Sequence, residues 1–188
     1  MTGDNPQADT EKGNGESVPN YLGDDPVAFS ALVHRYQDSL FAYLGRMGLA
    51  QPVCEELAQE AFLRAWKNRS KYDAAKASVS TWLFTIARNL ALNTLTRKTP
   101  AVIEEFDVEQ QPSSGTDPQV QYENHQSVVH LRQALSTLSI EDREVIAACY
   151  TPEIENKTDV LRCSGGALRT RLSRARKRLA SALAELEK

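Results

Sequence analysis

The spacing of apolar residues predicts amphipathic helices along most of this chain. Apolar positions recur three and four residues apart in stretches that are separated by Gly, Pro and Ser, as expected for helices with one buried face. We therefore expect an all-α protein. The expected helices cover 25–48, 53–69, 80–98, 128–138, 141–150, 156–162 and 168–186.

The first expected helix has clear start and stop signals. Asp24 or Asp25 is suited to the N-cap, and Pro26 then occupies the first helical position. Gly48 is a suitable C-terminal stop. The polar residues 1–22, with several Gly and Pro, predict a disordered tail.

The helix at 53–69 combines an apolar stripe with an acidic opposite side. Leu57, Ala61 and Phe62 belong to the stripe, and Cys54 and Val53 precede it. The first turns carry the polar side chains Glu55, Glu56, Gln59 and Glu60, and the last turn is basic. This order suits the helix dipole, so a solvated helix face explains this segment alone about as well as a binding surface.

The helix at 80–98 has a polar side of the opposite character. Trp82, Leu83 and Ile86 supply its apolar side, and Ser80 or Thr81 is expected to cap it. Its polar side holds cations and amides and no acid: Arg88, Asn89, Asn93, Arg97 and Lys98. One helix that offers carboxylates and a neighbour that offers cations indicate two different partners.

Charge divides the chain into segments although its net charge is only −3 over 188 residues. The stretch 100–120 holds acids, Gln, Pro, Ser and Gly and no Lys or Arg, as expected of a flexible acidic linker. The C-terminal stretch is strongly basic, which favours a polyanion as its partner. We therefore expect a tail over 1–22, helical domains over 23–99 and 121–188, and a linker over 100–120.

The C-terminal domain has the pattern of a helix-turn-helix. Ser139 with Asp142 forms an approximate capping box for the helix at 141–150. A short helix follows, with Ile154, Val160 and Leu161 as its expected inward positions. A Ser-Gly-Gly turn then leads into a basic helix, the arrangement that places a second helix in the DNA major groove. A basic amphipathic helix on a solvated surface is the alternative.

Three stretches carry a family resemblance. E-E-L-A-Q-E-A-F-L-R-A-W and T-W-L-F-T-I-A-R-N resemble the second domain of bacterial RNA polymerase sigma factors of the extracytoplasmic-function group (group IV). G-A-L-R-T-R-L-S-R-A-R-K-R-L resembles the fourth domain of the same group. The resemblance covers about 24–98 and 126–183. It implies a sigma second domain and a helix-turn-helix fourth domain joined by the linker.

The resemblance also implies partners and site residues. It implies core RNA polymerase bound by Glu55, Glu56, Gln59 and Glu60, although Val53 stands where the family often has Asp. It implies minus-ten DNA bound by Lys76, Ser78, Ser80, Phe84, Arg88, Asn89, Asn93, Arg97 and Lys98. It implies minus-35 DNA bound by Arg169, Thr170, Arg171, Ser173, Arg174 and Lys177. An anti-sigma factor that covers these surfaces is a further implied partner.

Two other function classes stay open on the residues alone. A helix-turn-helix regulator that acts without polymerase explains the basic C-terminal helix but leaves the acidic helix unexplained. An enzyme would need convergent catalytic groups, and the three scattered Cys and three scattered His residues provide neither these nor a zinc site. We expect no cofactor. The sequence lacks a transmembrane-length apolar run and a signal peptide, so we expect a cytoplasmic protein.

Overall fold

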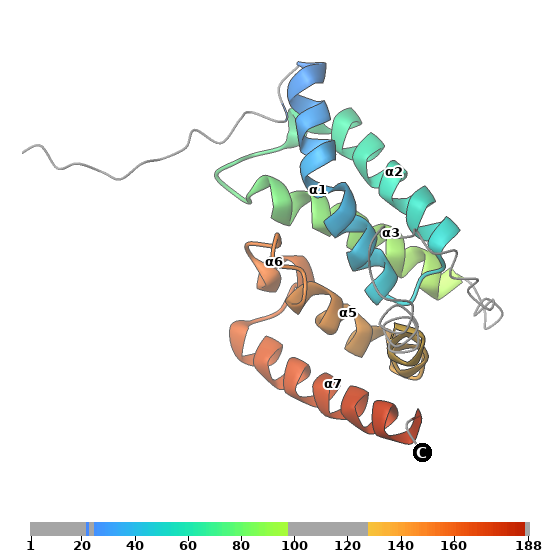
Figure 1. Cartoon of the computed structure of the whole chain (residues 1–188). Helices are drawn as coiled ribbons and strands as arrows, with labels where there is room; N and C mark the ends of the chain where they lie inside the picture. Colours follow the sequence, from blue (N-terminus) through green and yellow to red (C-terminus); the bar gives the residue numbers. More distant parts are fainter. Residues whose placement is uncertain (1–21, 23–24, 98–127, 187–188) are drawn as a thin grey trace, which may run out of the picture.

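The computed structural model describes residues 22, 25–97 and 128–186, and these residues form helices and connecting turns without strands (Figure 1). This confirms the all-α prediction. The helices are α1 (Pro26–Arg46), α2 (Gln51–Lys67), the 3-10 turn η1 (Arg69–Lys71), α3 (Val79–Arg97), α5 (Ile140–Cys149), α6 (Lys157–Leu161) and α7 (Gly165–Leu186). Residues 128–136 are also helical. The predicted disordered tail and acidic linker lie outside the described residues, as does Lys98.

Capping residues explain where several helices begin. Asp25 caps α1, with its carboxylate accepting from the Val27 N–H at 2.9 Å, and Pro26 follows at the first position as predicted. Ser139 caps α5 by accepting from the Asp142 N–H at 3.2 Å, which confirms the second predicted cap. The predicted cap of α3 was wrong, because the helix begins at Val79 and places Ser80 inside its first turn.

Helices α1, α2 and α3 pack around a shared apolar core, in the upper half of Figure 1. Leu32, Leu40 and Tyr43 of α1 are fully buried against this core, together with Phe84 of α3. At about 1.5–3 kcal/mol for each buried large side chain, this burial is the main source of stability in these three helices.

Helices α5, α6 and α7 form the second group. Val145 on α5 packs with Ile154 and Val160, which have no exposed surface, and Leu161 is 3% exposed. The predicted inward register of the short helix is therefore confirmed. Asn156 caps α6 by accepting from the Asp159 N–H. Helix α7 packs against α5. The order of short helix, turn and long helix is the one expected of a helix-turn-helix.

The two helical groups touch each other in the structure. Helix α1 lies against α5, and α3 lies against α6, so the buried residues of both groups form one continuous core (Figure 1). Gly48 ends α1 with φ +83°, a left-handed conformation that favours glycine. A Cβ on Gly48 would come within 2.0 Å of Arg143 Nη1 from α5. Glycine thus serves both the turn and the close approach, while the division into two domains stays a prediction.

Candidate protein and nucleic-acid interfaces

The acidic side of α2 is a continuous exposed surface. Glu55, Glu56 and Gln59 are exposed, and Glu60 is half-buried in an ion pair with Arg64 at 2.6 Å. Leu63 lies four positions after Gln59, and 46% of its surface is exposed. Leu63 was not predicted as a site residue from the sequence, although its helical spacing from Gln59 and Glu60 was a signal. An exposed apolar side chain beside polar and charged ones is typical of a protein-binding surface.

The turn between α2 and α3 is held by aromatic and polar contacts. Tyr72 donates to the Ala77 carbonyl at 3.0 Å and packs against Trp82, with ring centroids 5.3 Å apart. Trp82 is thus partly buried against the turn. Lys76 forms an ion pair with Asp73 at 3.0 Å, and hydrogen bonding to Lys76 is the main cause that lowers the pKa of Asp73. These contacts give the turn a defined shape.

Three hydroxyl groups at the start of α3 bond to one another. Ser78 caps the helix by accepting from the Thr81 N–H at 3.3 Å, and its hydroxyl lies 3.1 Å from that of Ser80. Ser80 is 1% exposed and Thr81 is 3% exposed. The Asn156 N–H, at the start of α6, donates to Thr81 Oγ1 at 3.3 Å. The expected role of Ser80 as a DNA-facing residue does not fit this buried position.

Phe84 also differs from its expected role. It has no exposed surface, and its ring makes edge contacts with Tyr43 and Tyr36 of α1 at centroid distances of 5.4 and 6.4 Å. A base can stack on an aromatic ring only when one ring face is open. Phe84 is therefore a core residue in this structure, and Tyr72 and Trp82 are the partly exposed rings nearest the turn.

The polar side of α3 divides into two parts. Asn93 and Arg97 are exposed, while Asn89 is half-buried. Arg88 is largely covered, with 12% of its side chain exposed, because it forms an ion pair with Glu144 of α5. The far end of the helix is therefore open to a ligand, and Arg88 faces the second helical group.

Glu144 is a buried carboxylate that joins three helices. Its Oε1 pairs with Arg88 of α3, and its Oε2 accepts from Arg171 of α7 at 3.0 Å. The Tyr43 hydroxyl is buried nearby and has no hydrogen-bond partner among the described residues. Burial first, and the Glu144 charge second, raise the pKa of Tyr43. Glu144 could not be predicted from the sequence, because nothing in its local pattern distinguishes it from other helical acids.

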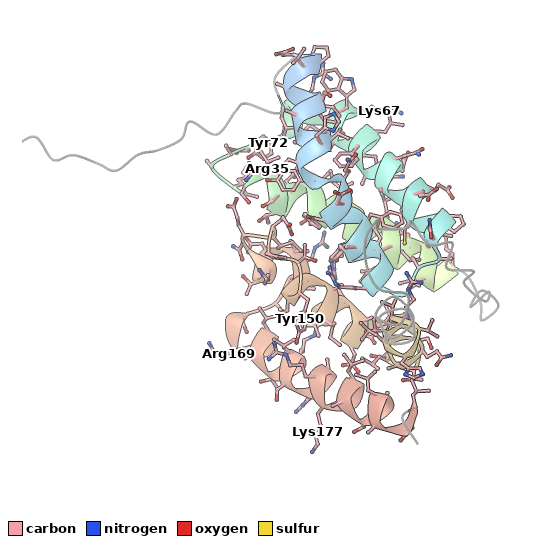
Figure 2. All side chains as sticks on the ribbon, viewed as in Figure 1. Arg35, Lys67, Tyr72, Tyr150, Arg169 and Lys177 are labelled. Carbon is pink, nitrogen blue, oxygen red and sulfur yellow. The ribbon has the colours of Figure 1, made fainter. Side chains whose placement is uncertain are left out.

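The outer side of α7 is basic and exposed. Figure 2 shows Arg169 and Lys177 pointing away from the rest of the molecule. Thr170, Ser173 and Arg174 are exposed as well. Arg171 differs from its expected role, because it turns towards Glu144 and the Glu141 carbonyl. This side of α7 could contact a polyanion through five of the six expected residues.

Two further arginines of α7 make structural contacts that were not predicted from the sequence. Arg178 pairs with the Asp142 carboxylate, and Arg176 lies 5.3 Å from the centre of the Tyr150 ring. Tyr150 is about half exposed. These contacts fix α7 on α5, so the exposed cations of α7 extend from a rigidly positioned helix.

The described residues contain no cluster of three metal-ligating side chains and no helix long and apolar enough to span a membrane. The three cysteines are free. Cys54 is buried and donates to the Leu49 carbonyl at 3.4 Å, and burial raises its pKa to about 12. A thiol that stays protonated and covered is a structural residue.

Comparison with known proteins finds one matching family model and several similar sigma factors. The family model described as Sigma-70 region 2 matches residues 32–100. The chain is 28% identical over 133 residues to the ECF RNA polymerase sigma factor RpoE of Cereibacter sphaeroides, covering 71% of this chain and 72% of that one. It is 29% identical over 178 residues to the ECF RNA polymerase sigma factor SigW of Bacillus subtilis, covering 86% and 92%.

A solved structure agrees at the level of the fold. The sigma factor RpoE of Bartonella quintana, solved in complex with the anti-sigma factor NepR, superposes with a TM-score of 0.65 at 22% identity, covering 83% of this chain and 96% of that chain. The sequence matches thus span both helical groups, and the fold likeness covers the same extent. Residues 32–100 thus match a Sigma-70 region 2 domain, and most of the chain is similar to extracytoplasmic-function RNA polymerase sigma factors.

Proposed function

We propose that this protein is a sigma factor that binds core RNA polymerase through α2 and directs it to promoters through α3 and α7. The observation that carries the proposal is the pairing of opposite surfaces on one molecule. The same molecule presents an exposed acidic side on α2, an exposed polar end on α3 and an exposed basic side on α7. A regulator that binds duplex DNA alone has no use for the first surface. Sigma factors are not an enzyme family, and no catalytic step is part of this proposal.

The polymerase contact is proposed for Glu55, Glu56, Gln59 and Glu60. Carboxylates on a rigid helix attract a basic partner and fix its register, which raises the rate and specificity of association. Leu63 adds exposed apolar area at the C-terminal end of this surface. Val53 is half-buried at the start of α2, where the sigma family often has Asp. Compared with Asp, Val at this position removes one negative charge from the surface and leaves the packing of the core unchanged.

The minus-ten contact is proposed for the turn before α3 and for its exposed end. Lys76, Asn93 and Arg97 are accessible in this arrangement, and the Tyr72 and Trp82 rings frame the turn. Cations bind the phosphates of the strand, while amides can read base edges. Ser78 is bonded within the hydroxyl cluster and supports the shape of the turn.

The minus-35 contact is proposed for the start of α7. In a helix-turn-helix the N-terminal residues of the second helix meet base edges in the major groove. Arg169, Thr170 and Ser173 occupy those positions. Arg174 directly follows Ser173, and Lys177 lies about one turn beyond it. Both suit phosphate contacts.

An anti-sigma factor and a cytoplasmic location are also proposed. The similar Bartonella quintana protein was solved with an anti-sigma factor, and the CnrH structure, which has a TM-score of 0.63, was solved with the cytosolic domain of CnrY. Covering the same α2, α3 and α7 surfaces would prevent assembly with polymerase. Work on the bacterial chromosome places such a protein in the cytoplasm.

The test is run-off transcription with purified core polymerase on DNA from upstream of the protein's own gene. Glu56→Lys is compared with Glu185→Lys, which makes the same charge change at an exposed position near the end of α7. We expect specific transcripts with the wild type and with Glu185→Lys, and a loss of at least about tenfold with Glu56→Lys, equivalent to about 1.4 kcal/mol of polymerase affinity. Absence of any transcript, together with specific duplex binding by the protein alone, would instead support the regulator.

A further inference from the structure

We propose that the arrangement seen here is a closed state of the free sigma factor, in which Glu144 holds Arg88 and joins the two helical groups. This inference rests on the proposed function, because it assigns Arg88 a DNA contact in the open state. Opening would then be a required step between the free protein and the promoter complex. Glu144 would act as the latch residue, although it contacts no DNA itself.

The latch is a buried charge network across the contact between the groups. Glu144 lies on α5 with 5% of its side chain exposed, and each carboxylate oxygen binds a different arginine. Arg88 comes from α3 in the first group, while Arg171 comes from α7 in the second. A buried carboxylate with arginines on both oxygens is compensated, whereas a single buried partner left behind is strongly unfavourable.

Other contacts across the same boundary support the closed arrangement. The Asn156 N–H donates to Thr81 Oγ1 at 3.3 Å, and Arg46 Nη1 donates to Thr151 Oγ1 at 3.3 Å. The absence of a side chain at Gly48 allows the Arg143 guanidinium to approach the end of α1. The boundary is therefore a specific interface formed by α1, α3, α5 and the segment before α6.

The contacts at this boundary compete with DNA. Arg88 Nε is paired with Glu144, and only 12% of the Arg88 side chain is exposed, so a phosphate has little access to this guanidinium in the closed state. The start of α3 is covered at Thr81 by the segment before α6. DNA on α3 and the second helical group on α3 are thus mutually exclusive at these residues, which is the requirement for a two-state switch.

The geometry of a promoter requires separation of the two groups as well. The minus-ten and minus-35 elements lie about 25 base pairs apart by their names, which is about 85 Å at about 3.4 Å per base pair. In this structure a hydrogen bond of 3.3 Å joins the start of α3 to the residue before α6. The chain between the groups, residues 98–127, could span at most about 100 Å when extended, which is enough for the open state.

Hydrogen–deuterium exchange on the free full-length chain tests the latch. Glu144→Gln removes the charge that both arginines share, and Glu185→Gln makes the same charge change at an exposed position. We expect exchange in residues 151–156 and 79–84 to become at least about tenfold faster in Glu144→Gln and to stay unchanged in Glu185→Gln. Unchanged exchange in Glu144→Gln would overturn the proposal.

DNA binding by the free protein provides the second readout, with a mixed-sequence single-stranded oligonucleotide as the probe. If only a minor fraction of the wild type is open, its apparent affinity is reduced by that fraction. Opening by Glu144→Gln should raise the affinity about tenfold, against a change within about twofold for Glu185→Gln. Equal gains in both variants would show a simple charge effect and overturn the competition.

A second variant tests the closed state independently, in case Glu144→Gln loses helical content and is partly unfolded. The double change Arg46→Met/Thr81→Val removes two contacts of the boundary from the first helical group and leaves α5 intact. It must accelerate exchange in residues 151–156 in the same way, and normal protection there would overturn the closed state. Run-off transcription by the wild type tests the proposed sigma function and does not depend on these results. Failure of the proposed function can therefore be distinguished from failure of the closed state.

Discussion

Replacement of Phe84 by alanine separates a core role from a base-stacking role. Phe84 has no exposed surface and makes edge contacts with Tyr43 at 5.4 Å and Tyr36 at 6.4 Å between ring centroids. Truncation of a buried Phe to Ala costs about 3–5 kcal/mol, to which the lost aromatic pairs contribute about 0.5–1.5 kcal/mol. With a urea slope of about 2 kcal/mol per molar, the unfolding midpoint should fall by about 2 M.

The assay is urea unfolding followed by circular dichroism in the helical band. Asn93→Ala is the matched control, because Asn93 is exposed on the same helix and its loss should change the free energy of unfolding by less than about 0.5 kcal/mol. Phe84→Leu should lie between the two, since it retains part of the ring's volume. If Phe84→Ala unfolds at the same urea concentration as Asn93→Ala but fails in transcription, the buried-core assignment is wrong.

Three other changes test local features of the structure. Ser139→Ala removes the cap of α5 and should cost about 1 kcal/mol, seen as a fall of about 3 °C in Tm, and an unchanged Tm would contradict the cap. The pKa of Cys54 is raised from 9.0 to about 12, so its protonated thiol contributes stability below pH 9 that is lost as the pH rises towards 12. The free energy of unfolding should therefore fall less between pH 9 and pH 12 in Cys54→Ala than in the wild type. A thiol reagent at about pH 8 should label the half-buried Cys149 well before Cys54. Glu60→Gln breaks a surface pair with Arg64 and should change the free energy of unfolding by less than about 0.5 kcal/mol, measured by urea unfolding, so a larger loss would indicate a structural role.

Helix positions could be predicted from the sequence because they depend on local chemistry. The spacing of apolar residues, the Asp25–Pro26 start and the Ser139 cap act within a few residues of each helix end. The exposed acidic side of α2 and the basic side of α7 were predictable for the same reason, since both follow from helical periodicity. Their proposed ligands stay predictions.

The buried side of α3 was predicted less well because two apolar stripes lie close together on it. Trp82 and Ile86 define one stripe, and both are only half-buried. The better signal was small residues, since Ala87 and Ala91 follow Phe84 at helical spacing and let α3 approach its neighbours closely. Residue size, considered together with hydrophobicity, would have identified the packed face.

The ion pairs between distant helices could not be predicted at all. Arg88 and Glu144 are 56 residues apart, and any acid on the second group was an equal candidate from the sequence. The pairing depends on how the groups pack, which local patterns do not determine. The same reason explains why Arg171 was assigned to DNA rather than to α5.

The pairing of two α7 arginines with acids of α5 has a consequence for how binding responds to salt. An exposed cation that binds phosphate displaces condensed ions from DNA, so each such contact steepens the fall of affinity with ionic strength by about 0.9 in a double-logarithmic plot. Arg171 and Arg178 already have Glu144 and Asp142 as fixed counterions within the protein. They add little to ion displacement while they stay in those pairs. The α7 surface should therefore be less sensitive to ionic strength than the number of its arginines suggests.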